Sequence, residues 1–354
     1  MKIAIITDTH WGVRNDNVAF MDNSKEFLDE VFFPTIKREA IRTVVHLGDL
    51  VDRRKYINIR TASRLRKDFL DRLADWELDV HLIAGNHDTY FKNTNTVNAL
   101  RELVVDKYDF KIYDQLPFEW DFDGTKVLIL PWICDENREA SIHAIRNTPA
   151  QIVMGHLELQ GFEMFRGSIV SHGDDPSLFD RFDVVMSGHY HHRSSRGNIH
   201  YLGSHAEFTW SDYSDPRGFH IFDTETRNLT FVENPYRMFK KIWYNDADAT
   251  FLNTEIDYAQ YKNCMLKVII QEKTNLFWFD KFIENIESEN PLDIQIVEDH
   301  LNLNLEEDSD IVNEAESTID IFKKYISGFD DKTVNKQKLE NKIVELYNEA
   351  LTVE

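Results

Sequence analysis

The sequence begins with a hydrophobic run that ends in polar residues, IAIITDTH at residues 3–10. The same form recurs four times, as VVHLGDLVD (44–52), HLIAGNHD (81–88), IVMGH (152–156) and VVMSGHYH (184–191). A strand that is buried on both faces reads as a continuous run of Val, Ile and Leu. Ligands of α/β sheets bind just beyond the carboxyl ends of such strands. The five runs therefore predict a sheet edge where Asp, Asn and His side chains gather.

These strand ends supply oxygen atoms and imidazole nitrogens, and none supplies a thiolate. We expect the metal ligands to be Asp8, His10, Asp49, Asn86, His156, His189 and His191. This donor set suits Mn²⁺, Fe or Zn²⁺ better than Ca²⁺, which prefers oxygen alone. Asp-Thr-His and Gly-Asp-Leu-Val-Asp are each common by chance, whereas Gly-Asn-His-Asp and Gly-His-Tyr-His are stronger signals. Five such motifs in a consistent order are not expected by chance. The set fits two metal ions with one bridging carboxylate, an arrangement that hydrolyses phosphate esters.

The spacing of His189 and His191 sets a condition on the backbone. Alternate residues of an extended strand point to opposite faces. A turn must therefore begin here if both side chains bind metal.

The pattern between the motifs predicts the fold. Strands alternate with amphipathic helices from residue 1 to about 232, and after His191 the strands follow one another through turns. We expect a four-layer α/β/β/α sandwich, with two packed sheets and helices outside. Pro235 breaks a strand ladder and marks a boundary. We expect a catalytic domain at 1–233, a small α/β domain at 234–304 and a helical tail at 305–354.

The tail carries two apolar stripes at helical spacing, over Ile311–Ile326 and Leu339–Ala350. Such stripes can pack on their own chain or bind a partner.

Composition limits the class of protein. The 354 residues carry a net charge of −22, which argues against a general nucleic-acid binder because phosphate contacts need Lys and Arg. A local basic cluster begins at Arg53, Arg54 and Lys55, and either a solvated helix face or a DNA contact explains it. Cys134 and Cys264 lie far apart, so we expect buried free thiols and a reducing compartment. We find no signal peptide and no apolar run near 18 residues, and expect a soluble, intracellular protein.

The motifs D-x-H, G-D-x-x-D, G-N-H-D, G-H and G-H-x-H resemble those of the calcineurin-like metallophosphoesterases. Within that superfamily the chain resembles the SbcD-type nucleases, also called the meiotic-recombination-eleven family, and in particular their T-even bacteriophage branch. The segments that carry this resemblance are LPWICDEN (130–137), GHLELQGF (155–162), SHG (171–173) and DPRGF (215–219). The specific resemblance covers roughly residues 1–245.

The resemblance implies how the ligands divide. Asp8, His10, Asp49 and His191 would hold one ion, whereas Asp49, Asn86, His156 and His189 would hold the other. His87 would be the catalytic histidine, and Asp88 would orient its ring. Some relatives carry His at the position of Asp52, and an ionised Asp52 cannot donate a proton in its place.

The resemblance also implies activity and partners. We expect Mn²⁺-dependent 3′→5′ exonuclease action on duplex DNA and endonuclease action on single strands. An SbcC-type coiled-coil ATPase would bind the C-terminal helices, and a homodimer would lie within a heterotetramer.

Two other hypotheses compete with the nuclease. A protein phosphatase or small-molecule phosphodiesterase would use the same metal site. Serine/threonine phosphatases usually show Gly-Asn-His-Glu and an Arg-Gly after the second motif, whereas this chain has Asp88 and Arg53-Arg54. An inactive scaffold for the ATPase would normally have lost ligands, and none is missing here.

Overall fold

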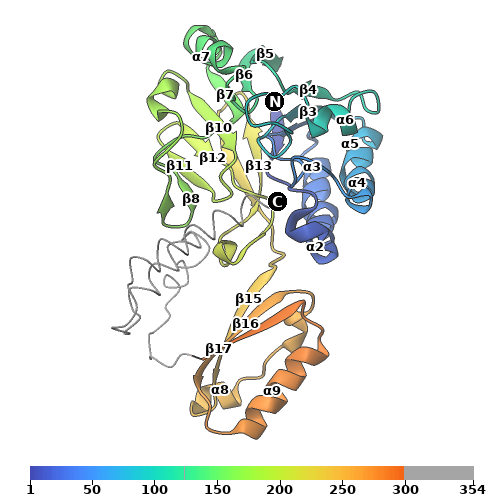
Figure 1. Ribbon diagram of the computed structural model, residues 1–354, viewed down its shortest axis with the longest axis vertical. Coiled ribbons are helices and arrows are strands. Elements are labelled where there is room, and N and C mark those ends of the chain that lie inside the picture. Colours follow the sequence, from blue (N-terminus) through green and yellow to red (C-terminus); the bar gives the residue numbers. More distant parts are fainter. Residues whose placement is uncertain (123, 299–354) are drawn as a thin grey trace, which may run out of the picture. The chain divides into compact units, whose positions relative to one another are not determined.

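Two six-stranded sheets form the larger part of the computed structural model, which describes residues 1–122 and 124–298 (Figure 1). The first sheet has the order β14-β13-β1-β2-β3-β4. Strands β1 to β4 are parallel, whereas β13 and β14 are antiparallel to their neighbours. Its bounds are β1 (Lys2–Ile6), β2 (Thr43–His46), β3 (Asp79–Ile83), β4 (Lys111–Tyr113), β13 (Gly218–Asp223) and β14 (Leu229–Glu233).

The second sheet has the order β11-β12-β10-β7-β6-β5. Its central strands β12, β10, β7 and β6 are parallel, and its two edge strands are antiparallel. The bounds are β5 (Phe118–Phe122), β6 (Thr125–Leu130), β7 (Ile152–His156), β10 (Val184–Gly188), β11 (Ser194–Arg196) and β12 (Ile199–Tyr201). A separate hairpin joins β8 (Glu163–Phe165) to β9 (Ser168–Ile169).

Alternation along each strand assigns its residues to two different cores. In β1, Ile3 and Ile5 pack with Ile129 and Met154 of the other sheet, whereas Ala4 and Ile6 pack among helical side chains. A third core covers the outer face of the second sheet. The predicted four-layer α/β/β/α arrangement is therefore confirmed.

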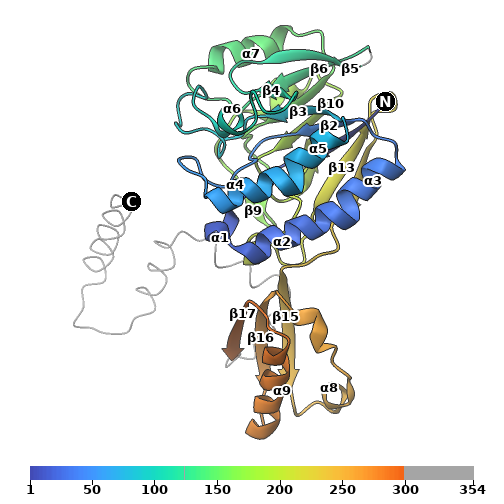
Figure 2. The same cartoon turned by 90° about the vertical axis from the view of Figure 1, so that its right-hand side faces the viewer.

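Helices cover the outer faces of the two sheets. Figure 2 shows α2 to α5 in front of the first sheet, and Ile145 of α7 belongs to the core on the second. Leu28–Phe32 continues α2 into α3 as a π-helical turn, and Arg66–Leu70 does the same between α4 and α5. The helices of this part are α1 (Val13–Asp16), α2 (Val18–Phe27), α3 (Phe33–Arg38), α4 (Ile59–Leu65), α5 (Asp71–Asp75), α6 (Ala99–Leu103) and α7 (Arg138–Asn147).

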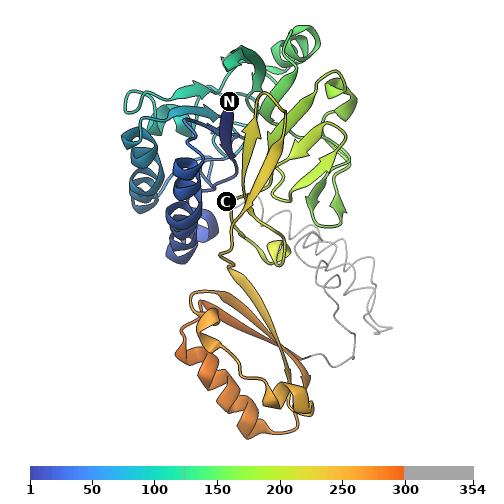
Figure 3. The ribbon, with the colours of Figure 1, turned by 180° about the vertical axis from the view of Figure 1, so that it is seen from behind.

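A three-stranded parallel sheet follows, in the order β15-β16-β17. Figure 3 shows the orange helix α9 along one face of it. Phe282 and Ile286 of α9 pack there on Leu266 and Val268 of β16. Its elements are β15 (Phe239–Asn245), α8 (Ala249–Asn253), β16 (Met265–Glu272), α9 (Leu276–Ser288) and β17 (Asp293–Glu298).

The described residues belong to one compact unit, Met1–His300, and the domain bounds at 233/234 and 304/305 stay predictions. The two predicted tail helices lie outside the described residues. Within residues 1–122 and 124–298, no helix is long and apolar enough to cross a membrane. Both cysteines, Cys134 and Cys264, are buried free thiols, as expected.

Candidate metal centre

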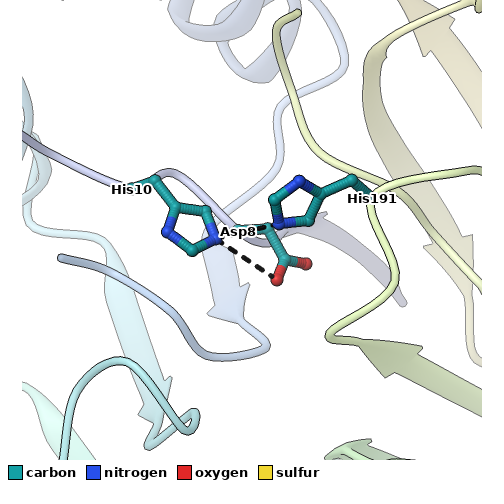
Figure 4. Close-up of side chains that lie close together, drawn as sticks. All are labelled: Asp8, His10 and His191. Atoms are coloured by element: carbon teal, nitrogen blue, oxygen red, sulfur yellow. Dashed lines mark hydrogen bonds and ion pairs between the residues drawn. The ribbon is translucent and has the colours of Figure 1, made fainter. Parts of the chain in front are cut away.

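The carboxyl ends of β1, β2, β3, β7 and β10 meet, and the seven predicted ligands lie close together there. One group consists of Asp8, His10 and His191, whose side chains point toward one another (Figure 4). His191 Nε2 lies 3.0 Å from His10 Nε2, which lies 4.0 Å from Asp8 Oδ1. Two ring nitrogens and a carboxylate oxygen therefore share one small space, as the ligands of one ion would.

A second group forms around Asn86. Its Oδ1 lies 3.0 Å from His156 Nε2 and 2.9 Å from His189 Nδ1. Asp49 links the two groups, because its Oδ2 lies 3.6 Å from His10 Nε2 and 3.3 Å from His156 Nε2. A carboxylate in this position can bridge two ions.

Four of these residues have an unusual backbone. The φ angles are 51° at Asp8, 42° at His10, 54° at Asp49 and 87° at His189. Positive φ is disfavoured for residues other than glycine, and such strain persists mainly where function requires it. The angle at His189 makes the turn that allows both His189 and His191 to face the centre.

Glycines give the ligands room. A Cβ at Gly85 would lie 2.2 Å from Asp49 Oδ1, and one at Gly48 would lie 2.4 Å from His156 Nδ1. A side chain at either position would displace a ligand. The glycines of the Gly-Asp and Gly-Asn-His motifs are thus explained by close packing against the centre.

The buried carboxylates and histidines of the centre shift one another's pKa values. Burial raises the pKa of Asp8, and the nearby Asp49 carboxylate raises it further. Burial alone would lower the pKa of His156, but Asp49 raises it to about 9. Burial and the charge of His156 lower the pKa of His189 to about 3. A proton on His156 therefore offsets part of the buried negative charge, and a divalent cation fits the same role.

His87 lies beside this centre with a partner that the sequence did not predict. Its ring is 4.8 Å from that of His10, and its Nδ1 lies 2.5 Å from the carbonyl oxygen of Asp52. Asp88 accepts instead from the N–H groups of Leu50 and Gly85, both at 2.9 Å. In the structure, the Asp52 carbonyl holds the ring of His87, whereas Asp88 fixes the loops around it.

The Asp52 carboxylate faces another ligand. Its Oδ1 lies 3.5 Å from His10 Nδ1. A metal-bound histidine commonly donates its second N–H to a carboxylate, which fixes the ring. Asp52 is therefore within ion-pair distance of His10 Nδ1, where a carboxylate can orient the ring.

The basic residues after the second motif differ from one another. Arg53 contacts Asp16 at 3.1 Å and Asn15 at 2.5 Å. Arg54 is half-buried and donates to the carbonyl of Phe91 at 3.4 Å, while Lys55 is exposed. Arg53 is therefore engaged within the chain, and Lys55 is accessible.

Sequence reasoning did not assign a role to Trp132 or Glu158. The Trp132 ring lies 5.2 Å from that of His189, and Glu158 Oε1 lies 4.0 Å from His189 Nε2. Their positions in the sequence could have pointed to this site, because Trp132 comes just after β6 and Glu158 just after β7, at the carboxyl ends of parallel strands.

Comparison with known proteins agrees with this geometry. Residues 1–193 match the family model described as calcineurin-like phosphoesterase. Exonuclease subunit 1 of Enterobacteria phage T4 is 33% identical over 291 residues, which are 81% of this chain and 82% of that protein. The SbcD component of the SbcCD nuclease of Staphylococcus saprophyticus is 25% identical over 289 residues, covering 73% of this chain and 76% of that protein.

A solved structure of an archaeal phosphodiesterase is 16% identical, with a TM-score of 0.33, and the match covers 66% of this chain and 99% of that one. The family match and the first relative decide the assignment: the chain belongs to the calcineurin-like phosphoesterase family, as a metal-dependent phosphodiesterase related to the SbcD-type nucleases.

Proposed function

We propose that this chain is the nuclease subunit of a DNA-processing complex and that it cleaves phosphodiester bonds with two divalent ions, Mn²⁺ in the first place. The position of Asp49 is the main support. Its Oδ2 is within 3.6 Å of a ring nitrogen from each histidine group, so one carboxylate is available to both ions. The proposed ligands are Asp8, His10, Asp49 and His191 for one ion, and Asp49, Asn86, His156 and His189 for the other.

The ions, when bound, would lower the pKa of a water molecule and offset the charge of the phosphodiester. His87 would act on the leaving oxygen. Its Nδ1 must donate to the Asp52 carbonyl, because a carbonyl oxygen only accepts. Nε2 is then the atom that exchanges a proton with the leaving oxygen. Asp88 supports this arrangement indirectly, by holding Gly85 and Leu50.

DNA is the proposed substrate because two relatives are named as exonuclease or nuclease subunits. We propose 3′→5′ exonuclease action on duplexes and endonuclease action on single strands. Arg54 and Lys55 would offer positive charge on the segment that follows Asp52, whose carbonyl contacts His87, while Arg53 would mainly hold Asp16. An SbcC-type ATPase is the proposed partner, bound through residues 305–354, with two copies of this chain in a heterotetramer.

The test uses the purified chain and three substrates: a duplex, a single strand and a phosphopeptide. Mn²⁺-dependent cleavage of both DNA forms is expected, with release of nucleotides from 3′ ends, and EDTA should abolish it. His87→Ala should reduce cleavage at least about 100-fold, at the lower limit for a general acid. The matched control is His143→Ala, which changes an exposed histidine on α7.

Hydrolysis of the phosphopeptide without DNA cleavage would show that the chain is a phosphatase. Unchanged cleavage by His87→Ala would refute the catalytic assignment. Co-expression with an ATPase encoded next to this gene tests the partner, since a stable complex should co-purify only when residues 305–354 are present.

A further inference from the structure

A pocket of about 270 Å³ borders the metal centre on the side of the second sheet. Trp132, Arg138, Glu158 and Asp174 line it, together with the backbone of Gly173. Drug-sized ligands usually occupy about 300–1,000 Å³, so this pocket suits a smaller group. Neither the metal ligands nor His87 uses it.

Trp132 forms a fixed wall of this pocket. The backbone N–H of Trp132 donates to the carbonyl of Ala84 at 2.8 Å. Its own carbonyl accepts from Asn95 Nδ2 at 2.7 Å and from Asn137 Nδ2 at 3.0 Å. These bonds hold the backbone of Trp132 in place, and its half-buried side chain lines the pocket.

The same indole also touches the centre. Its ring lies 5.2 Å from the ring of His189 and 6.1 Å from that of His156. A group bound against the indole would therefore lie next to His189 and His156, two of the proposed metal ligands.

The rim of the pocket is polar. Glu158 Oε1 lies 3.0 Å from His172 Nε2. Arg138 forms a two-pronged ion pair with Asp174, which also lines the pocket. The Asp174 N–H donates to the carbonyl of Glu158 at 2.8 Å, so the two sides are tied together. An aromatic wall with a carboxylate and a guanidinium at its edges matches a flat ring that carries hydrogen-bonding groups.

We propose that this pocket is a nucleobase subsite, in which the base of the nucleotide bearing the attacked phosphate stacks on Trp132. The inference rests on the proposed nuclease function. Base–aromatic stacking tolerates any sequence and typically changes affinity by a factor of about 5 to 150. Such a subsite would give a chain with a net charge of −22 a contact to DNA that does not depend on the phosphates.

The test measures binding of two monoesters, thymidine 5′-phosphate and methyl phosphate, to the Mn²⁺-loaded full chain by calorimetry. The ratio of the two dissociation constants measures how much the nucleoside, and with it the base, contributes to binding. The wild-type protein should bind the nucleotide at least about 10-fold more tightly. Trp132→Leu should bring the ratio to within about 2-fold, and Trp132→Phe should restore most of it because a phenyl ring also stacks. Trp243→Leu, on β15, is the matched control and should keep the wild-type ratio.

Two results would overturn the subsite: a wild-type ratio near one, or the same ratio in Trp132→Leu as in the wild type. A purely structural role for Trp132 beneath the histidines would weaken both ligands equally and leave the ratio unchanged. Binding needs no turnover, so the subsite is judged separately from the nuclease. A base-dependent ratio without DNA cleavage would reject the proposed function and keep the subsite.

Discussion

Asp8 at the metal edge and Asp246 in the three-stranded region are both buried, with 0% and 3% exposure. Burial raises the pKa of Asp8, and Asp49 adds to this rise. Burial would also raise the pKa of Asp246, but N–H groups of Thr274 and Asn275 outweigh it and lower that pKa. Neighbouring N–H groups thus stabilise the charge of Asp246, whereas burial and the nearby Asp49 disfavour the charge of Asp8. Burial alone does not identify a metal ligand. Burial would raise the pKa of Asp49 as well, but His156 holds that pKa well below its usual range, and Asp49 is still a proposed ligand.

The largest expected effect is that of Asp8→Asn. Hydrolysis of a DNA phosphodiester should fall by about 1,000-fold, more than the roughly 10- to 100-fold typical of residues behind the ligands. The metal-free variant should be at least as stable as the wild type at pH 8, since Asn removes a disfavoured charge and tolerates the φ of 51°. Nuclease assays and urea unfolding in EDTA measure the two effects. A loss of stability would mean that the protein itself stabilises the Asp8 charge.

Glu207 is a buried carboxylate whose charge is disfavoured although it lies in none of the candidate metal-ligand groups of the described residues. It is 1% exposed and accepts from the N–H groups of Met238 and Phe239 at 2.8 and 3.0 Å. Burial raises its pKa from 4.5 to about 7. A raised carboxyl pKa lowers stability progressively between pH 4.5 and 7, and the loss is complete above pH 7. It should amount to about 3 kcal/mol.

Glu207→Gln should therefore be more stable than the wild type at pH 8, and the gain should vanish toward pH 4.5. Urea unfolding in EDTA at both pH values measures the difference, with the exposed Glu287→Gln as the control. An equal difference in stability between Glu207→Gln and the wild type at both pH values would show that the charge of Glu207 is not the cause. Because Glu207 lies outside the candidate ligand groups within the described residues, Mn²⁺ should leave this difference unchanged.

Much of the fold and the site was predictable because parallel strands bring their carboxyl ends to one edge. The five Val- and Ile-rich runs became β1, β2, β3, β7 and β10, and the seven polar side chains after them do lie together. Strand β15 was not predicted, since Lys240 and Lys241 interrupt its apolar pattern. The contact between His87 and Asp52 was also missed, because a backbone carbonyl acceptor has no signature in the sequence.

The smallest expected effect is that of Asp246→Asn in the three-stranded region. Asp246 accepts from Thr274 N–H at 2.6 Å and from Asn275 N–H at 2.8 Å, just before α9. Asp246→Asn replaces one acceptor with a donor and should lower stability by about 1–2 kcal/mol at pH 7. A lowered pKa means that this stability is present above pH 3.8 and is lost as the pH falls further.

Hydrolysis of a small phosphodiester should stay within about 2-fold of the wild type, the reverse of Asp8→Asn. Urea unfolding at pH 7 and a chromogenic diester assay measure the two quantities. The same chemical change would then remove activity at one buried aspartate and stability at the other. An activity loss at Asp246 comparable with that at Asp8 would show that the three-stranded region acts directly on the metal centre, and the two aspartates would then not have separate roles.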